Sequence, residues 1–284
     1  MQLNDAQSRD FLKQGFVIVP AFYDLEADIV PVQREIHTVI DIVRRKYGLP
    51  YAAAFAPGDF DGGWSELIAR NRSYGAEVYD AVKQLPSFLR LVAHPRHAAA
   101  LRQLRGTDLP GVAAGGYGIR IDNPGEQRFH ADWHQEYPAQ LRSPDGITFW
   151  SPLAAVAAEM GPVIFCVGSH RQGMRRIHTH DPANPEKTGA YSLVLADREA
   201  IVASYPHEAP LTVPGDAVLI DFAVLHASGQ NRGRRARWTS QIRYFNFRDP
   251  TGVRNAWCGS FAAGTDFRRI HPELVAGGSA GNDR

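Results

Sequence analysis

From about residue 113 onward, the chain consists of short runs rich in β-branched and aromatic residues, separated by Gly, Pro, Asp and Asn. Short strands at regular intervals, with turn signals between them, are typical of antiparallel sandwiches and barrels. Helical patterns do not alternate with these runs, which argues against a Rossmann fold or a TIM barrel. The runs are YGIRI, QRFHADWHQEY, ITFWSPL, PVIFCVG, APLTV, AVLIDFAVLHAS and RWTSQIRYFNF.

The residues before this region are expected to be mainly helical, apart from one short β-type run, FVIV. Apolar residues recur at helical spacing from Ile29 to Val43, and Gly48 stands where such a helix would end. We therefore predict a mainly β protein with α-helices: a double-stranded β-helix, that is, a cupin-like jelly roll. The predicted parts are a supporting helical layer (about 1–110), the jelly-roll core (about 113–248), a single domain over 1–275, and a flexible tail (276–284).

Charge and composition exclude several classes of protein. The 31 basic and 30 acidic residues give a net charge of +1, so neither nucleic acid nor a membrane surface is expected as a partner. No apolar run approaches the 18 residues of a membrane span, and the polar start MQLNDAQSRDFLKQ does not resemble a signal peptide. Cys166 and Cys258 lie far apart without zinc spacing, as in a protein of the reducing cytoplasm.

The stretch FHADWHQEYP places side chains that can bind a metal at every second position. If it is extended, His130, Asp132, His134 and Glu136 face the same side of a strand. A PGD turn later leads into a run that ends near His226. Two histidines and one carboxylate on neighbouring strands would form the facial triad of non-haem Fe(II) oxygenases, although zinc accepts the same ligands. At this level the strand offers two H-x-[DE] pairs for the metal.

An open iron site of this kind needs an electron-donating co-substrate, and a keto acid such as 2-oxoglutarate would fill two of its positions. The far carboxylate of a keto acid requires a forked cation, which arginine provides. Arg237 follows His226 by eleven residues, at the start of the next strand-like run, and Ser228 can add a hydroxyl from the face of His226. The neighbouring arginines 232, 234 and 235 are expected to be solvated.

The ordered set of motifs resembles the phytanoyl-CoA dioxygenase-like family of Fe(II)/2-oxoglutarate oxygenases. That family has H-x-D, a strand ending in Trp, a Gly-containing turn, G-[ST]-H, a PGD turn, and H-x-S-x-x-N followed by Arg. The resemblance spans roughly residues 11–246 and includes the opening FLKQGFVIVPAF. The matching residues are His134-Gln135-Glu136, Trp150, Gly161, Gly168-Ser169-His170, Pro214-Gly215-Asp216, His226-Ala227-Ser228, Asn231 and Arg237.

The resemblance implies a 2-oxoglutarate-dependent dioxygenase that hydroxylates an aliphatic C–H bond and releases succinate and CO2. It favours His134 and Glu136, with His226, as the Fe(II) ligands. It implies that 2-oxoglutarate binds beside Arg237, Ser228 and Trp150, and that O2 takes the remaining position on iron. Glu136 departs from the usual aspartate, but halogenating relatives lack this carboxylate altogether. Its presence therefore favours hydroxylation or desaturation over halogenation.

The substrate is expected to be a small polar or anionic metabolite, or a natural-product intermediate. Contacts with it are predicted for Gln127, His130, Asp132 and Arg243. The long loop Arg171–Thr188 is a candidate lid, and its arginines 171, 175 and 176 are candidate partners of an anionic substrate.

Three alternatives stay open at the level of sequence. A jelly-roll enzyme using Zn²⁺ or Mn²⁺ for hydrolysis or isomerisation would use the same ligands without needing Arg237. A non-catalytic module that binds a small molecule would tolerate the loss of Glu136. Within the candidate lid, His178-Thr179-His180-Asp181 again alternates metal-capable groups and is a candidate second metal site. Oligomeric state cannot be predicted from these patterns.

Overall fold

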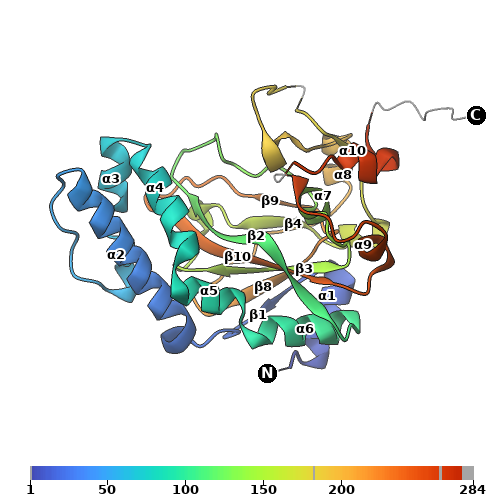
Figure 1. Cartoon of the computed structure of the whole chain (residues 1–284), viewed down its shortest axis with the longest axis horizontal. Helices are drawn as coiled ribbons and strands as arrows, with labels where there is room; N and C mark the ends of the chain where they lie inside the picture. The colour runs from blue at the N-terminus through green and yellow to red at the C-terminus, as the bar shows by residue number, and fades with distance from the viewer. Residues whose placement is uncertain (1, 182, 262–263, 277–284) are drawn as a thin grey trace, which may run out of the picture.

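The computed structural model describes residues 2–181, 183–261 and 264–276. Helices and strands carry the labels of Figure 1. In chain order they are α1 (Asp5–Gln14), β1 (Phe16–Val19), α2 (Val30–Lys46), α3 (Trp64–Arg70), α4 (Tyr74–Ala81), α5 (Pro86–Val92), α6 (Pro95–Arg105), β2 (Pro110–Asp122), α7 (Glu136–Gln140), β3 (Gly146–Pro152), β4 (Val163–Cys166), β5 (Ile177–His178), β6 (Val194–Leu195), α8 (Arg198–Ala203), β7 (His207–Glu208), β8 (Ala217–Asp221), β9 (His226–Ser228), β10 (Arg237–Asn246), α9 (Pro250–Arg254) and α10 (Phe267–Ile270).

Local sequence signals explain the helical N-terminal part. The side chain of Asn4 caps α1, and Gly15 ends it in the left-handed conformation, from which the chain enters β1. Pro31 lies in the first turn of α2, where its missing N–H is tolerated. The buried face of α2 includes Val32, Ile36, Ile40 and Val43, as the helical spacing predicted.

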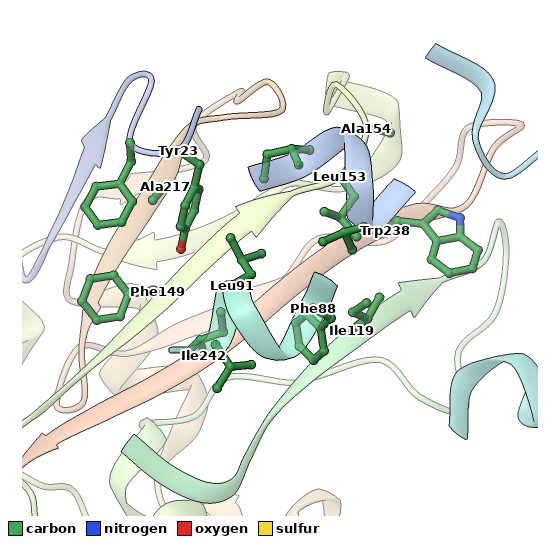
Figure 2. Close-up of a cluster of buried hydrophobic side chains, with 14 of the residues drawn as sticks. Tyr23, Phe88, Leu91, Ile119, Phe149, Leu153, Ala154, Ala217, Trp238 and Ile242 are labelled. Atoms are coloured by element: carbon green, nitrogen blue, oxygen red, sulfur yellow. The ribbon is translucent and has the colours of Figure 1, made fainter. Parts of the chain in front are cut away.

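The large sheet is antiparallel, with the order β1-β8-β3-β10-β2. The N-terminal helices lie beside it, with α6 against β2, β3 and β10 (Figure 1). Figure 2 shows Phe88 and Leu91 of α5 among Ile119, Trp238 and Ile242 of the sheet, all buried in one hydrophobic core. The predicted helical support therefore covers one face of the large sheet.

The opposite face of the large sheet packs against a small antiparallel sheet, of order β7-β4-β9. A second hydrophobic core lies between the sheets, where the rings of Phe16 and Phe165 stack with centroids 4.1 Å apart. Trp150 and Ile220 of the large sheet join Val163 of the small sheet in this core. Two antiparallel sheets face to face, with helices outside, confirm the predicted jelly roll.

Three local predictions were wrong. FHADWHQEYP is not a strand: it is irregular up to His134, which forms one isolated bridge with His226, and Glu136 begins α7. The run AVLIDFAVLHAS is split into β8 and β9 because the carboxylate of Asp221 accepts the N–H of Ala223 and closes a turn. His226 therefore begins a strand instead of ending one. APLTV is also not a strand, and β7 lies just before it.

The PGD turn forms as predicted: Gly215 has a φ of 98°, and Asp216 accepts the N–H of Val213. At the other end of the chain, the N–H of Ala276 donates to the carbonyl of Ile177 at 2.8 Å. The rest of the predicted tail lies outside the described residues. No helix of the described ranges combines the length and apolarity needed to cross a bilayer.

Candidate metal centre and co-substrate pocket

The backbone brings three ligand-type side chains together where β9 begins. His134 and His226 exchange two backbone hydrogen bonds of 3.0 Å, and the N–H of Glu136 donates to the carbonyl of Phe222 at 3.0 Å. Ligand atoms of His134, Glu136 and His226 lie within 4.8 Å of one another. Among the described residues, these three side chains are the group whose ligand atoms lie close enough together to hold a metal ion.

Hydrogen bonds fix the tautomer of both histidines. Nδ1 of His134 lies 2.7 Å from the carbonyl oxygen of Asp132, and Nδ1 of His226 lies 3.0 Å from that of Val224. Because a carbonyl only accepts, each Nδ1 must carry the proton and donate it. Each Nε2 therefore keeps a lone pair for a metal, which is the usual arrangement of a metal-binding histidine.

Electrostatics favours the protonation states that metal binding requires. Burial, and then the neighbouring His134, lowers the pKa of His226 to about 3, although Glu136 opposes the shift. Burial also lowers the pKa of His134. Burial alone would raise the pKa of Glu136, but Arg243 and the two histidines outweigh it and lower that pKa to about 2. At neutral pH the site therefore offers two neutral imidazoles and one carboxylate, the donor set that Fe(II) accepts.

The two oxygens of Glu136 have different surroundings. Nε of Arg243, from β10, donates to Oε1 at 2.6 Å. Oε2 lies 3.7 Å from Nε2 of His226. Glu136 is only 3% exposed and the side chain of Arg243 is 14% exposed, so the ion pair between them is largely removed from water. Arg243, predicted as a substrate contact, thus lines the cavity while bound to a candidate metal ligand.

The three side chains open into a cavity of about 360 Å³ between the two sheets and the candidate lid. Its polar wall includes several predicted residues: His130, Asp132, Trp150, Ser228 and Arg243. Further polar residues that sequence reasoning missed are Tyr79, Lys83, Tyr117, Arg120, Lys187 and Gln241, and an apolar side is formed by Val163, Ile177, Leu193, Leu195 and Ile220. The volume falls in the range of small-molecule sites, roughly 300–1,000 Å³.

Arg237 begins β10, as predicted, and is 1% exposed. Its Nη2 donates to Asp122 at 2.9 Å, whereas Nε and Nη1 are buried without a hydrogen-bond partner among the described residues. Nε1 of Trp150, which lines the cavity, is likewise buried and unpaired within the described chain. Buried donors are nearly always satisfied, so these atoms fit an anionic ligand. Arg237 itself is not among the residues that line the cavity.

The alternative H-x-[DE] pair does not join the three-residue cluster. The carboxylate of Asp132 forms an ion pair with Arg198 of α8, and the backbone carbonyl of Asp132 orients His134. His130 lines the cavity wall. Gln127 is exposed and lies outside the cavity lining.

Gln135 is a site residue that sequence reasoning missed. It is buried between the two candidate ligands of the H-x-E motif. Its Nε2 donates to the carbonyls of Ala223 (2.6 Å) and Gly173 (2.9 Å), and its Oε1 accepts the N–H of Arg175 (2.7 Å). Gln135 thereby connects the segment of the candidate metal ligands to the candidate lid through hydrogen bonds. In the sequence, the signal that could have identified Gln135 was a polar residue between two candidate metal ligands.

The candidate lid contains short secondary structure, and its described part spans residues 171–181 and 183–188. Its arginines bind the protein itself: Arg175 donates to the hydroxyl of Tyr205 at 2.7 Å and Arg176 to the carbonyl of Val275 at 3.3 Å. Asp181 accepts hydrogen bonds from Asn184 and Lys187. In this described part, the HTHD motif contributes no three-residue metal cluster.

Comparisons with known proteins agree with this geometry. The family model Phytanoyl-CoA dioxygenase (PhyH) matches residues 11–239. No curated protein sequence matches significantly. Among solved structures, the non-heme alpha ketoglutarate dependent carbocyclase SnoK from nogalamycin biosynthesis is 18% identical, with a TM-score of 0.57 and coverage of 91% of this chain and 92% of SnoK.

Two further structures resemble the chain. The epimerase SnoN in complex with Fe3+, alpha ketoglutarate and nogalamycin RO is 18% identical, with a TM-score of 0.56 and coverage of 92% of this chain and 91% of SnoN. EctD from S. alaskensis with 2-oxoglutarate and 5-hydroxyectoine is 16% identical, with a TM-score of 0.55 and coverage of 87% of this chain and 77% of EctD. At these identities the likeness establishes the fold. Because the family model covers most of the sequence, the chain belongs to the phytanoyl-CoA dioxygenase family of Fe(II)- and 2-oxoglutarate-dependent oxygenases.

Proposed function

We propose that this enzyme hydroxylates an aliphatic C–H bond of a small polar or anionic metabolite or natural-product intermediate, releasing succinate and CO2. The observation that carries the proposal is the cluster of His134, Glu136 and His226, whose ligand atoms lie within 4.8 Å of one another. Fe(II), 2-oxoglutarate and O2 supply the oxidising chemistry when bound. The residues of the chain hold the metal, orient the co-substrate and the C–H bond, and exclude water.

Arg237 is proposed to bind the 5-carboxylate of 2-oxoglutarate, with Ser228 and Trp150 beside the co-substrate. The support is the pair of buried, unpaired donors on the Arg237 guanidinium, in the described part of the chain. Alternation along β10 puts Arg237 on the same face of the sheet as Arg243, opposite the Trp238 core face. An arginine fork binds a carboxylate with two parallel hydrogen bonds, which lysine does not provide.

The substrate class is inferred from the wall of the cavity. Lys83, Arg120 and Lys187 supply cationic groups, paired with Asp80, Asp122 and Asp181, whereas Ile177 and Leu193 supply apolar surface. This lining suits a small molecule with a polar or anionic group and an aliphatic part. The nogalamycin and 5-hydroxyectoine named for the resembling structures are a natural product and a small metabolite, which supports the same range.

His130 and Asp132, which line the cavity together with Ile177 and Lys187 of the candidate lid, are proposed to contact this substrate. We also propose that residues 1–275 act as one oxygenase domain, since the N-terminal helices and the large sheet share one hydrophobic core. Cys166 and Cys258 are both free, which supports the cytoplasm as the site of action.

The test is turnover of a panel of small polar and anionic metabolites by the full chain with Fe(II), 2-oxoglutarate and O2. We expect at least one compound to raise succinate release several-fold and to gain one oxygen atom, as measured by mass spectrometry. Glu136→Ala should show neither effect. Conversion that proceeds with Zn²⁺ or Mn²⁺ and without 2-oxoglutarate would instead favour a hydrolase or isomerase. Tight binding without conversion under any of these conditions would favour a binding module.

A further inference from the structure

The metal carboxylate of this chain is one methylene longer than the aspartate usual in the family pattern. A longer carboxylate has more rotamers, and either or both of its oxygens can reach a metal. Ordering such a side chain has an entropic cost that metal binding must offset unless the protein has already fixed it. The structure contains a group that fixes Glu136.

That group is Arg243, and its guanidinium is held at three points. Nε donates to Oε1 of Glu136 at 2.6 Å, Nη1 donates to the carbonyl of Gly116 at 3.2 Å, and Nη2 donates to Oε1 of Gln241 at 2.9 Å. Arg243 pairs with Thr148 in the register of β10 and β3, so its backbone lies inside the large sheet. A guanidinium held at three points, on a strand that pairs regularly with β3, defines one position for the carboxylate.

The contact also divides the two oxygens of Glu136. Oε1 is taken by Arg243, while Oε2 faces Nε2 of His226 at 3.7 Å. We propose that Arg243 is a positioning residue for the metal site: it holds Oε1 so that Glu136 offers Oε2 alone as a ligand. A carboxylate that binds through one oxygen leaves three positions of an octahedral ion open for 2-oxoglutarate and O2.

A purely electrostatic role and a positioning role of Arg243 predict opposite effects of its removal on metal affinity. The cation of Arg243 repels a bound dication, so by Coulomb's law alone its removal should tighten metal binding. If Arg243 acts by orienting Glu136, its removal should weaken metal binding, as loss of groups that orient metal ligands commonly does, by about 10–100-fold. The sign of the change therefore separates the two roles.

The experiment is calorimetric titration of the full-length, metal-free chain with Co²⁺ alone, without 2-oxoglutarate. We expect Arg243→Met to weaken Co²⁺ binding by about 10–100-fold and Arg243→Lys by less, because lysine can still donate to Oε1. Arg234→Met removes an exposed cation that does not line this cavity, and should leave the affinity unchanged. Gln241→Leu keeps the charge of Arg243 but removes one of its anchors, and should weaken binding in the same direction.

A double-mutant cycle completes the test. In a Glu136→Ala background, Arg243→Met should no longer weaken Co²⁺ binding, because there is no carboxylate to position. Unchanged or tighter binding by Arg243→Met with Glu136 present would overturn the proposal, as would equal weakening in both backgrounds. If Arg243→Met does not fold, Gln241→Leu decides the sign. The inference rests on the proposed function, but the two fail differently: a native chain that binds no Co²⁺ contradicts the metal site itself.

Discussion

Replacing Glu136 with alanine is expected to lower the affinity for Fe(II) by at least about 100-fold, since loss of a group that only orients a ligand already costs 10–100-fold. The substitution removes the one anionic ligand of the cluster and leaves two neutral imidazoles. It also leaves the partly buried charge of Arg243 without its carboxylate partner, beside the position of a dication. Both changes act against metal binding. Anaerobic Fe(II) titration of the purified chain measures the effect.

Asp132→Ala is the matched control, four residues before Glu136 in the same stretch. The carboxylate of Asp132 pairs with Arg198, and it is the backbone carbonyl of Asp132 that orients His134. Alanine keeps that carbonyl, and the Asp132 side chain is 44% exposed, so Fe(II) affinity should stay within about twofold, as expected for a surface change of at most about 0.5 kcal/mol. Loss of Fe(II) binding in Asp132→Ala, with Glu136→Ala unaffected, would move the metal to His130 and Asp132.

Arg237→Ala is expected to raise the KM for 2-oxoglutarate by about 30- to 4,000-fold. Truncating one partner of a buried, hydrogen-bonded charge pair costs about 2–5 kcal/mol, and each 1.4 kcal/mol is tenfold in affinity. Loss of Arg237 does not strand its other partner, because Asp122 also binds Arg120 through two guanidinium nitrogens. The expected effect therefore falls on the co-substrate and not on folding. Initial rates against 2-oxoglutarate concentration measure it.

Arg234→Ala provides the control for Arg237. It removes an arginine three residues earlier, on the exposed part of the same segment, and should leave the KM for 2-oxoglutarate unchanged. Arg237→Lys should recover only part of the affinity, because an ammonium lacks the fork. Equal KM values for Arg237→Ala and the native chain would exclude Arg237 as the co-substrate anchor. Fe(II) binding without 2-oxoglutarate should be the same in all these variants.

The order of motifs along the chain was enough to predict the fold class and the family. Each motif couples a turn to a chemical group: the PGD turn starts β8, the H-x-S motif forms β9, and Arg237 begins β10. The helix around Ile36 could be predicted from the sequence because the spacing of its apolar residues reflects burial against one hydrophobic core. The residues of each such motif lie close together in the sequence, so the motif can be recognised in a single sequence.

The backbone conformation around His134 could not be predicted from the sequence in the same way. Alternation in FHADWHQEYP suggested a pleated strand, but it arises because several side chains serve one site, while the backbone bridges once and turns into α7. The same difficulty applies to contacts between distant segments. Arg243 is 107 residues from Glu136, and Arg198 is 66 residues from Asp132. No local pattern encodes such pairs, because they form only when the sheet and α8 are in place.

The central claim is that His134, Glu136 and His226 hold Fe(II) while Arg237 secures 2-oxoglutarate beside it. The most direct measurement is the visible metal-to-ligand charge-transfer band that Fe(II) and a chelating keto acid produce in the absence of oxygen. The native chain should show the band, Glu136→Ala should lack it, and Arg237→Ala should show it only at much higher 2-oxoglutarate concentrations. Absence of the band in the native chain, or a full-strength band in Glu136→Ala, would contradict the claim.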